Sequence, residues 1–303
     1  AWVCDKLERR AGHSIETSFS RFGSADYDIT AIDTPGTTNL LKNAISGCAQ
    51  ADAVVLVVSA ADADVDRGLH VSDNTRQHIM MAQAFGIKKI AVAVNKMDIT
   101  SWSQERFEDV KTKVSALLKN CGVNPKSVPF IPISAWRGEN LSKEPEKLPW
   151  FQGWMAGPKT GTSLLSAIDT FGVDARTDKP LRIPIQHVYN VDGVGMVAAG
   201  CVATGKLTAD STVTLAPGAA KVDLTSIESH HRSIKVAEAG EYVGFNVKAS
   251  AGEVCAGMVC GDANDDAPKE ESFSAQVMVV NGQVSFRSGF SAILDCHTAH
   301  VPC

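Results

Sequence analysis

The sequence predicts an α/β domain, with a mostly parallel sheet and helices on both faces, followed by a β barrel and the start of a second β barrel. Over residues 1–176, short apolar runs alternate with amphipathic stretches, which is typical of strands and helices in a parallel sheet. Over residues 177–266, turn residues separate short strand-like runs roughly every ten residues, which favours a small barrel. After a further break, strand-like sequence resumes at residues 272–280, so we expect a truncated second barrel at 267–303.

The strands of the first domain are expected at four places. Residues 27–32 alternate polar and apolar side chains, whereas residues 53–58 and 90–94 are continuous runs of Val, Ile, Leu and Ala. Continuous runs of this kind are typical of strands that are buried on both faces. A further strand is expected at residues 128–133.

Helices are expected between and after these strands. Residues 75–85 have helical composition, and residues 105–120 place apolar side chains on one face at helical spacing. Ser101 or Ser103 is the expected N-cap of the second helix, because a serine hydroxyl can accept a hydrogen bond from an unpaired N–H of the first turn. A final helix is expected at residues 163–171.

The chain changes character near residues 177–180, and no convincing helix is expected beyond them. Strands are expected at residues 181–188, 195–204, 211–216, 222–229 and 242–247. Short strands at this spacing indicate an antiparallel barrel or sandwich.

The overall composition excludes several classes of protein. Hydrophobic residues make up 44% and charged residues 21% of the chain, which is ordinary for a globular protein and unlike a disordered one. With 29 Lys and Arg against 34 Asp and Glu, the net charge is -5, so any nucleic-acid binding must use a local patch. The longest apolar run, residues 53–58, is far short of the roughly 20 residues that cross a bilayer. With no export leader recognised either, we expect a cytoplasmic protein without a membrane partner.

The cysteines indicate reduced thiols. Eight cysteines are spread along 303 residues without a repeated CxxC pair, which does not fit a disulfide scaffold. Near the end of the chain, Cys296, His297, His300 and Cys303 are ligand types that could bind zinc. No second cluster with structural-zinc spacing accompanies them, so we do not expect a zinc site.

Three short motifs follow predicted strands, at the sheet edge where open parallel sheets bind ligands. The first is Asp33-Thr34-Pro35-Gly36. Asp33 could hold Mg2+ through water, and Gly36 could let a backbone N–H approach a terminal phosphate closely. Alone, these residues are also typical of an ordinary turn.

The second motif is Asn95-Lys96-Met97-Asp98, after the run at residues 90–94. The Asp98 carboxylate could accept two hydrogen bonds from a guanine edge, while Lys96 lies over the ring and Asn95 braces the neighbouring loop. Adenine presents the wrong donors, and a mismatched base would leave a buried charge unpaired at a cost of roughly 1–3 kcal/mol. The alternative is a polar turn after a strand.

The third motif is Ser134-Ala135-Trp136, after the strand expected at residues 128–133. Its backbone N–H groups could donate to the carbonyl oxygen of guanine. This three-residue motif does not indicate a function by itself. The order of all three motifs along the chain predicts a site that binds GTP or GDP with Mg2+.

The sequence contains no G-x-x-x-x-G-K-[ST] phosphate loop, a motif that cradles nucleotide phosphates. Residues 157–161 lack the required spacing. In a nucleoside triphosphatase of this order the loop precedes the Asp33 motif, and residues 1–30 do not contain it. Because the chain also begins with Ala1 and stops after a strand-like stretch at 290–294, we expect a fragment whose GTP-binding domain is incomplete at its N-terminus.

Longer runs of the chain resemble translation elongation factor 1-alpha and its elongation-factor-like relatives. These runs are residues 1–3, 5–7, 42–43, 50–52, 92–98, 124–126, 128–134, 177–182, 230–231, 243–248 and 294–300. The resemblance covers nearly the whole chain. It implies a GTPase domain and two β barrels that deliver aminoacyl-tRNA to the ribosome, with GTP hydrolysis as the release switch and a guanine nucleotide exchange factor as a further partner.

Three departures from the family pattern bear on activity. The family has a His after the first motif that helps to position the attacking water, whereas this chain has Thr37. The family's Arg-Gly-Ile-Thr-Ile, with its Thr on magnesium, corresponds to residues 11–15, where Ser14 keeps a hydroxyl for the metal but the Arg is lost. In the first barrel, the family's Gly-Arg-Val-Glu-Thr-Gly has become residues 200–205 without either charge.

These departures keep an alternative function open. A divergent paralogue could bind guanine nucleotide as a regulatory scaffold and hydrolyse it poorly, and Thr37 at the usual position of the catalytic His supports this hypothesis. A termination or ribosome-rescue relative is a third hypothesis. The elongation-type runs extend too far into the barrels to favour it.

Overall fold

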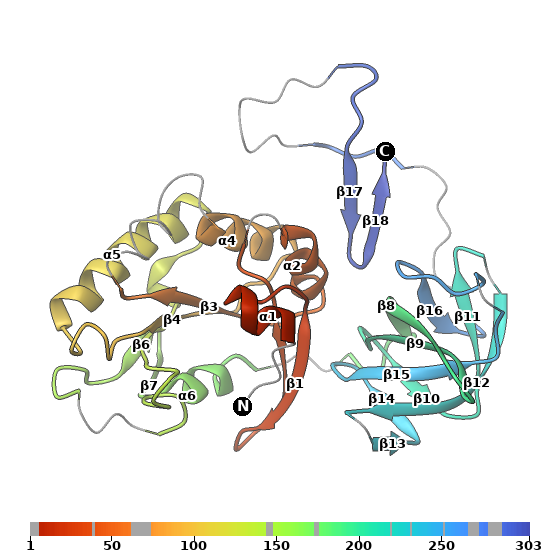
Figure 1. Cartoon of the computed structure of the whole chain (residues 1–303), viewed down its shortest axis with the longest axis horizontal. Coiled ribbons are helices and arrows are strands. Elements are labelled where there is room, and N and C mark those ends of the chain that lie inside the picture. Colours follow the sequence, from red (N-terminus) through yellow and green to blue (C-terminus); the bar gives the residue numbers. More distant parts are fainter. Residues whose placement is uncertain are drawn as a thin grey trace. The chain divides into compact units, whose positions relative to one another are not determined.

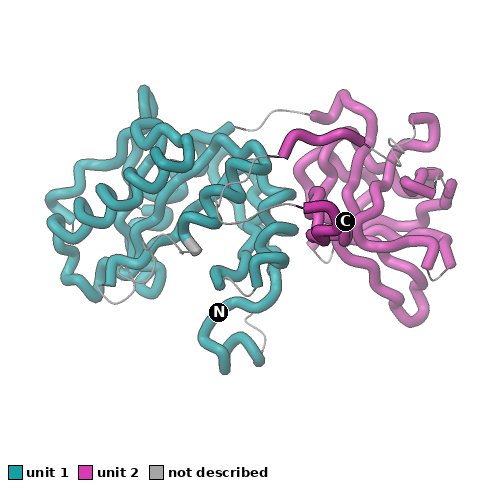
Figure 2. Tube along the Cα trace, turned by 90° about the horizontal axis from the view of Figure 1, so that it is seen from above, with its two compact units in different colours: residues 1–173 teal, residues 174–303 magenta. Residues whose placement is uncertain are grey.

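The computed structural model describes residues 6–37, 40–61, 74–143, 148–172, 176–218, 220–230, 232–250, 252–265, 273–277 and 287–303. The chain divides into two compact units, Ala1–Val173 and Asp174–Cys303 (Figure 2). This division lies close to the change of character seen in the sequence near residue 177. Among the described residues, no helix has both the length and the apolar character of a membrane span.

The first unit is built on a parallel sheet with the strand order β3-β4-β5 (Figure 1). The strands are β3 (Val54–Ser59), β4 (Ile90–Asn95) and β5 (Phe130–Pro132), and both pairings are parallel. All residues of β4 before Asn95 are buried, as its continuous apolar run predicts. The expected parallel sheet is therefore confirmed.

The helices of the first unit include the three that the sequence predicts. They are α1 (Lys6–Ala11), α2 (Leu41–Cys48), α4 (Asn74–Ala84), α5 (Gln104–Asn120) and α6 (Leu164–Asp169), with a short 3-10 helix η2 (Pro125–Ser127). Of the two expected caps, the structure uses Ser103, whose hydroxyl accepts the Arg106 N–H at 3.3 Å. Ser163 and Ser166 form a reciprocal capping box at the start of α6. α2 was not expected.

The two faces of the parallel sheet are covered by different helices. Val92 and Val94 of β4 belong to a buried cluster with residues of α4 and α5. Ala91 and Ala93, which alternate with them along the strand, pack in a second cluster with Ala167 of α6. This alternation is the ordinary geometry of a strand, and it confirms helices on both faces.

Two antiparallel hairpins complete the first unit. They are β1 (Ser18–Gly23) with β2 (Asp28–Asp33), and β6 (Trp154–Ala156) with β7 (Lys159–Gly161). The strand expected at residues 27–32 is present as β2, whereas β1 was not expected. No residue of β1 is buried, so no apolar run marks it in the sequence.

The second unit contains a closed ring of six antiparallel strands among its described residues. The order is β11-β16-β8-β9-β15-β12, and β11 also pairs with β12 to close the ring. The strands are β8 (Arg182–Val191), β9 (Gly195–Cys201), β11 (Thr212–Ala216), β12 (Ala220–Ser229), β15 (Tyr242–Val247) and β16 (Val259–Asp262). The predicted barrel is confirmed, and β16 is the strand of the ring that the sequence did not suggest.

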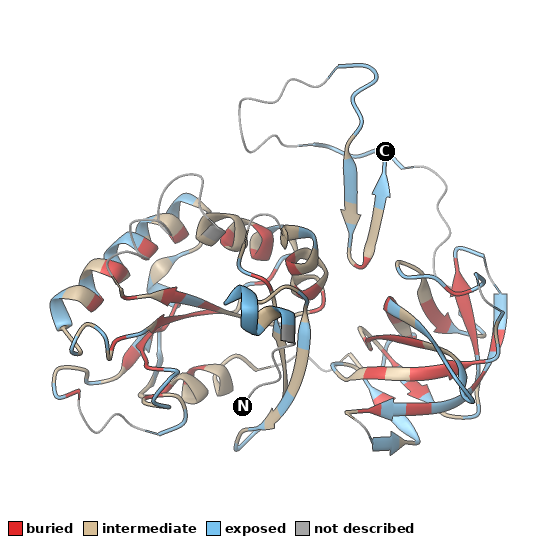
Figure 3. Ribbon diagram, viewed as in Figure 1, coloured by how far each residue is buried: buried red, intermediate tan, exposed pale blue. Residues whose placement is uncertain are grey.

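Shorter strands flank this ring, and its core is apolar. β13 (Arg232–Ile234) pairs with β12, and β10 (Lys206–Thr208) pairs with β14 (Val236–Glu238). Along β12, buried positions alternate with exposed ones over much of the strand (Figure 3). The buried side chains meet inside the barrel, where Ile183 and Phe245 are fully buried.

The chain continues after the barrel to a hairpin of β17 (Ile293–Cys296) and β18 (Ala299–Pro302). The strand expected at residues 272–280 is wrong for its described part, because residues 273–277 have no regular structure; the rest of that range lies outside the described residues. Phe273 and Val277 are 71% and 70% exposed. The apolar residues there therefore lack the packing that a barrel strand requires.

The structure describes most of the cysteines and the four candidate zinc ligands near the end of the chain. The cysteines that the structure describes are free. Within the described residues, no three His, Cys, Asp or Glu side chains are grouped so that they could hold a metal ion. His300 instead contacts the Asp295 carboxylate across the β17–β18 hairpin.

Candidate nucleotide-binding site

The loops that follow β4 and β5 are joined at the end of the parallel sheet. The Ile133 N–H donates to the Val94 carbonyl at 2.8 Å, and the Met97 N–H donates to the Ile133 carbonyl at 3.2 Å. On the other side of β4, the Ala60 N–H donates to the Asn95 carbonyl at 2.7 Å. The parallel strands therefore bring the second and third motifs to one place.

The Asn95 side chain lies at the centre of this junction. Its Oδ1 accepts the Lys96 N–H at 2.8 Å and the Ala135 N–H at 2.9 Å. One amide oxygen thus holds the loop after β4 against the loop after β5. Lys96 has a φ of 65°, so the chain bends directly after the strand and leaves this lysine exposed.

The Asp98 carboxylate lies beside Arg137, a residue that the motifs did not include. Arg137 Nε is 3.8 Å from Asp98 Oδ2, and the two side chains are 53% and 15% exposed, respectively. This is a long ion pair with one solvated partner. Neither carboxylate oxygen of Asp98 accepts a hydrogen bond within the described part of the chain, so both can accept donors from a ligand.

The loop that carries the third motif closes on itself. The Ser134 N–H donates to the Glu139 carbonyl at 3.2 Å, and the Glu139 N–H donates back to the Ser134 carbonyl at 3.1 Å. Because the Ala135 N–H is bonded to Asn95, the N–H of Trp136 is the one of the three without an acceptor among the residues described. Trp136 is also 93% exposed, so this N–H is the donor available to a ligand carbonyl.

A buried asparagine that belongs to none of the three sequence motifs anchors the same loop. Asn140 is 2% exposed, and its Nδ2 donates to the Pro132 carbonyl at 2.9 Å. Its φ is 59°, a left-handed conformation that asparagine adopts more readily than most residues. The Leu164 N–H donates to the Asn140 carbonyl at 3.1 Å, which fixes the loop to the start of α6. No sequence motif signals this role, because it depends on contacts made in the fold.

At the end of β2, the two predicted metal ligands come together. The Ser14 hydroxyl donates to Asp33 Oδ2 at 3.3 Å. Asp33 is the exposed last residue of β2, and Ser14 is half-buried. The segment after Ser14 is held by Glu8, whose Oε1 accepts the Ile15 N–H at 2.7 Å, and by Asn43, whose Nδ2 donates to the Ile15 carbonyl at 2.9 Å.

The turn after Asp33 is open around Gly36. This glycine is exposed, and a Cβ added to it would meet no atom within 4 Å. The packing of the described residues therefore does not require glycine here, whereas the close approach of a ligand would. Thr37 is half-buried, and its carbonyl accepts the Leu40 N–H at 3.0 Å. Among the described residues its side chain makes no hydrogen bond.

A histidine from α4 contacts this turn and was also missed. His78 Nε2 lies 3.3 Å from the carbonyl oxygen of Pro35. Because a carbonyl only accepts hydrogen bonds, this contact assigns a hydrogen to Nε2. An imidazole is thus present beside the turn even though Thr37 stands where the family has a His.

Within residues 200–205, packing in the barrel explains the two glycines that this chain shares with the family pattern, whereas nothing in the structure explains the loss of the two charges. A Cβ on Gly200 would come within 2.3 Å of the Pro184 carbonyl oxygen, and one on Gly205 within 2.6 Å of Leu181 Cα. Gly205 also has a φ of +76°. These glycines allow neighbouring segments of the barrel to approach closely, so they indicate barrel assembly.

Comparison with known proteins identifies the first unit. The family described as Elongation factor Tu GTP binding domain matches residues 3–173, which is more than half of the chain. The chain is 42% identical over 312 aligned residues to elongation factor 1-alpha of Mucor circinelloides f. lusitanicus, covering 100% of this chain and 68% of that protein. The same identity and coverage are found for elongation factor 1-alpha of Absidia glauca and elongation factor 1-alpha-A of Schizosaccharomyces pombe.

Solved structures of translation factors share the fold. Translation elongation factor SelB from Methanococcus maripaludis, in complex with the GTP analogue GppNHp, matches with a TM-score of 0.75 at 20% identity, covering 95% of this chain and 58% of that one. The bacterial selenocysteine-specific elongation factor EF-Sec matches with a TM-score of 0.66 at 22% identity, covering 84% and 40%. The chain thus spans less than two thirds of either structure, and at these identities the likeness shows the fold alone.

The comparisons confirm the family resemblance that the sequence suggested. The identity extends over the whole chain and so includes the barrel as well as the first unit. Guanine-nucleotide binding belongs to the matched domain, which contains the junction at Asn95. The chain belongs to the elongation factor 1-alpha family of translation elongation factors, which are GTP-binding GTPases.

Proposed function

We propose that this protein delivers aminoacyl-tRNA to the ribosome in a GTP-dependent manner and releases it when GTP is hydrolysed. The observation that carries the proposal is the junction at Asn95. It holds together the two loops that present Asp98 and the Trp136 N–H. Membership of the elongation factor 1-alpha family supports the same conclusion.

We assign guanine selection to the two loops at this junction. The Asp98 carboxylate would accept the ring N–H and the amino group of guanine, and the Trp136 N–H would donate to the guanine carbonyl. Lys96 would lie over the ring, while Ser134 and Ala135 shape the loop around it. Adenine would leave these groups mismatched, and each charge-assisted hydrogen bond contributes about 1.5–3 kcal/mol.

We assign phosphate and metal binding to the region of Ser14, Asp33 and Gly36. The Ser14 hydroxyl and the Asp33 carboxylate lie 3.3 Å apart, and both are the oxygen ligands that Mg2+ prefers. Ser14 would contact the ion directly and Asp33 through water. The bound ion would neutralise phosphate charge. Gly36 would bring its N–H to the terminal phosphate, so that the loops around Ser14 and Gly36 differ between the two nucleotide states.

The proposal also includes the cellular location, the exchange factor and the domain boundaries. The protein would act in the cytoplasm, and a guanine nucleotide exchange factor would restore its GTP form. With a net charge of -5, its contacts with tRNA would come from local patches. The proposed domains are residues 1–176, 177–266 and 267–303, the last of them the start of a second barrel.

One observation favours a second candidate function. Thr37 stands at the position of the family's His, and its side chain makes no hydrogen bond to the described residues around it. A threonine hydroxyl has a shorter reach than an imidazole. A guanine-nucleotide-binding scaffold that hydrolyses GTP poorly would tolerate this change.

Single-turnover GTP hydrolysis separates the two candidates. The protein expressed from its complete reading frame is loaded with GTP and assayed with and without ribosomes, and its binding of aminoacyl-tRNA is measured in parallel. Ribosome-stimulated hydrolysis together with tRNA binding supports the elongation function. GTP binding without stimulation supports the scaffold. Binding of ATP as tight as that of GTP would contradict both.

A further inference from the structure

We infer that Arg106 is a positioning residue for guanine recognition, because it closes the loop that carries Lys96 and Asp98. This inference rests on the proposed function, since it concerns the base end of the same site. Arg106 lies in the first turn of α5, outside every motif found in the sequence, and its side chain is only 18% exposed.

The closure takes place at Ala60, the first residue after β3. The Ala60 N–H donates to the Asn95 carbonyl at 2.7 Å, and the Ala60 carbonyl accepts the Arg106 Nε–H at 2.8 Å. Ala60 itself is completely buried. Asn95 and Arg106 are the two ends of one segment, which we call the 95–106 loop. Both ends are therefore fixed to a single buried residue.

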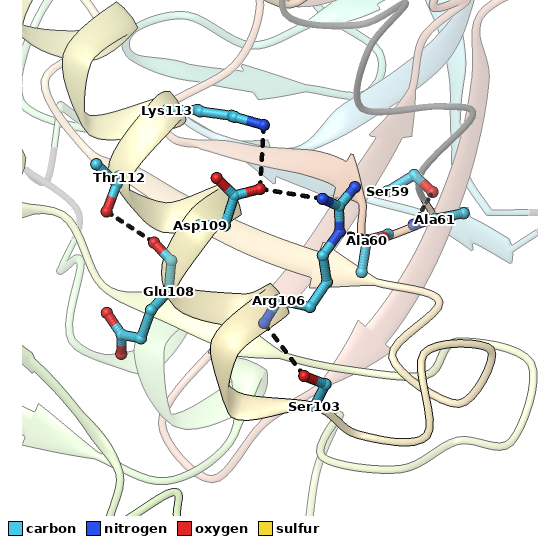
Figure 4. A network of polar contacts seen from close by, with 9 residues as sticks. All are labelled: Ser59, Ala60, Ala61, Ser103, Arg106, Glu108, Asp109, Thr112 and Lys113. Carbon is cyan, nitrogen blue, oxygen red and sulfur yellow. Dashed lines mark hydrogen bonds and ion pairs between the residues drawn. The ribbon is translucent and has the colours of Figure 1, made fainter.

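The Arg106 side chain is held in place from its other side (Figure 4). Its Nη1 donates to Asp109 Oδ2 at 3.0 Å, and Lys113 Nζ contacts the same oxygen at 3.0 Å. A planar guanidinium presents its donors in a fixed fork, so it can hold a carbonyl and a carboxylate at the same time, which a flexible ammonium does less well. Hydrogen bonds from a charged donor are also stronger than those between neutral groups.

The closure reaches the base end through Asn95. This residue has its carbonyl bonded to Ala60, while its side-chain oxygen joins the loops after β4 and β5. Loss of the Arg106 contact would leave the buried carbonyl of Ala60 without this charged donor. The 95–106 loop would then be less constrained, and Asp98 would spend less time in the position that guanine requires.

Three variants test this role in the protein expressed from its complete reading frame. Arg106→Met keeps most of the apolar stem but removes the donors. We expect it to weaken GDP binding about three- to tenfold, less than the full value of a charge-assisted hydrogen bond, because Arg106 acts on the nucleotide only through the 95–106 loop. Arg106→Lys keeps one charged donor and should lose less. The control Lys113→Ala removes another partner of Asp109 but leaves both bonds of Ala60, so GDP binding should be unchanged.

Amide hydrogen exchange provides a readout that general destabilisation would not reproduce. The N–H groups of Lys96 and Ala135, which donate to Asn95, should exchange faster in Arg106→Met than in the Lys113→Ala control. Amides of the β1–β2 hairpin, which belongs to the same unit as Arg106, should not change. If Arg106→Met shows no cooperative unfolding transition, it is not properly folded. Arg106→Lys is then compared with Lys113→Ala instead, and the expected effect is smaller.

The outcomes distinguish this inference from the proposed function. Equal GDP affinity and equal exchange in the Arg106 and Lys113 variants would overturn the role of Arg106. A parent protein that binds ADP as tightly as GDP would overturn the proposed function. In that case the exchange rates of Lys96 and Ala135 still decide whether Arg106 closes the loop.

Discussion

The base end and the phosphate end of the candidate site are held by different kinds of contact. At the base end, Asn95 Oδ1 accepts two backbone N–H groups, and backbone bonds from Ala60 and Ile133 tie the loops to buried strands. At the phosphate end, a side-chain hydrogen bond joins half-buried Ser14 to exposed Asp33. Among the described residues, the base end is therefore held mainly by backbone bonds to buried strands, whereas the phosphate end is held mainly by side chains, including those of Glu8, Asn43 and His78.

This difference fits the two tasks that we assign to these ends. A site that selects one base needs side chains on rigid supports, whereas a switch needs a segment whose rearrangement costs little free energy. The departures from the family pattern at Ser14 and Thr37 both fall at the phosphate end. Guanine selectivity should therefore survive changes that alter hydrolysis, and the following predictions test that separation.

The largest effect is expected from Thr37 at the phosphate end. Groups that position a nucleophile or exchange a proton with it contribute about 10²–10⁴-fold to a reaction rate. Ribosome-stimulated hydrolysis should therefore be slow in the protein as it stands, and Thr37→His should recover about 10²-fold. GDP affinity should hardly change, because the role that we propose for this position concerns the attacking water and not the base. Single-turnover hydrolysis on ribosomes and a GDP titration measure the two quantities.

Fast hydrolysis by the unmodified protein would contradict this prediction. It would indicate that the turn after Asp33 has been rebuilt and that another side chain supplies the function. His78, whose Nε2 contacts the Pro35 carbonyl at 3.3 Å, is then the first residue to replace. His78→Gln keeps a hydrogen-bond donor but removes the imidazole, so it separates the support of the turn from a role of the ring.

A smaller but still large effect is expected from Asp98 at the base end. Asp98→Asn removes the charged acceptor and should weaken GTP binding more than about tenfold, since each lost charge-assisted bond contributes about 1.5–3 kcal/mol. Xanthosine triphosphate, whose base carries a carbonyl in place of the amino group, should then bind better than GTP. Competition binding with the two nucleotides measures this preference.

The matched control is Asp28→Asn on the β1–β2 hairpin, which removes the partner of Arg21 in an exposed ion pair. It should leave the nucleotide preference unchanged. If Asp98→Asn still prefers GTP over xanthosine triphosphate, the assignment of Asp98 to the guanine edge is wrong.

The sequence predicts the elements whose burial leaves a local pattern. β4 is a continuous apolar run because helices cover both of its faces, and α5 shows its buried stripe at helical spacing. β1, by contrast, has no buried residue, and β16 is a short strand that contains a glycine. The apolar residues at 273–277 suggested a strand, but no packing in the described structure supports one.

The residues of the candidate site also fall into two groups, those that a local sequence pattern predicts and those that only the fold reveals. Asn95 and Asp98 can be proposed from the sequence because they belong to one continuous motif, residues 95–98. Arg106 and His78 cannot, because each acts on a backbone carbonyl far away in the sequence, at Ala60 and Pro35. Such contacts exist only after the strands and helices have packed together, and no local pattern records them.

The smallest effect is expected from Arg137, which tests whether the base end holds a group that competes with its ligand. Arg137 Nε is 3.8 Å from Asp98 Oδ2, and its side chain is 53% exposed. Exposed ion pairs contribute about 0–1 kcal/mol, and salt screens them. Because guanine would need the same carboxylate, Arg137→Ala should raise GDP affinity at low salt by no more than about fivefold, and the gain should vanish at high salt.

Arg137→Lys, which keeps the charge, is the control. A loss of about tenfold or more would mean that Arg137 itself contacts the nucleotide, and the base end would then include a residue outside the family motif.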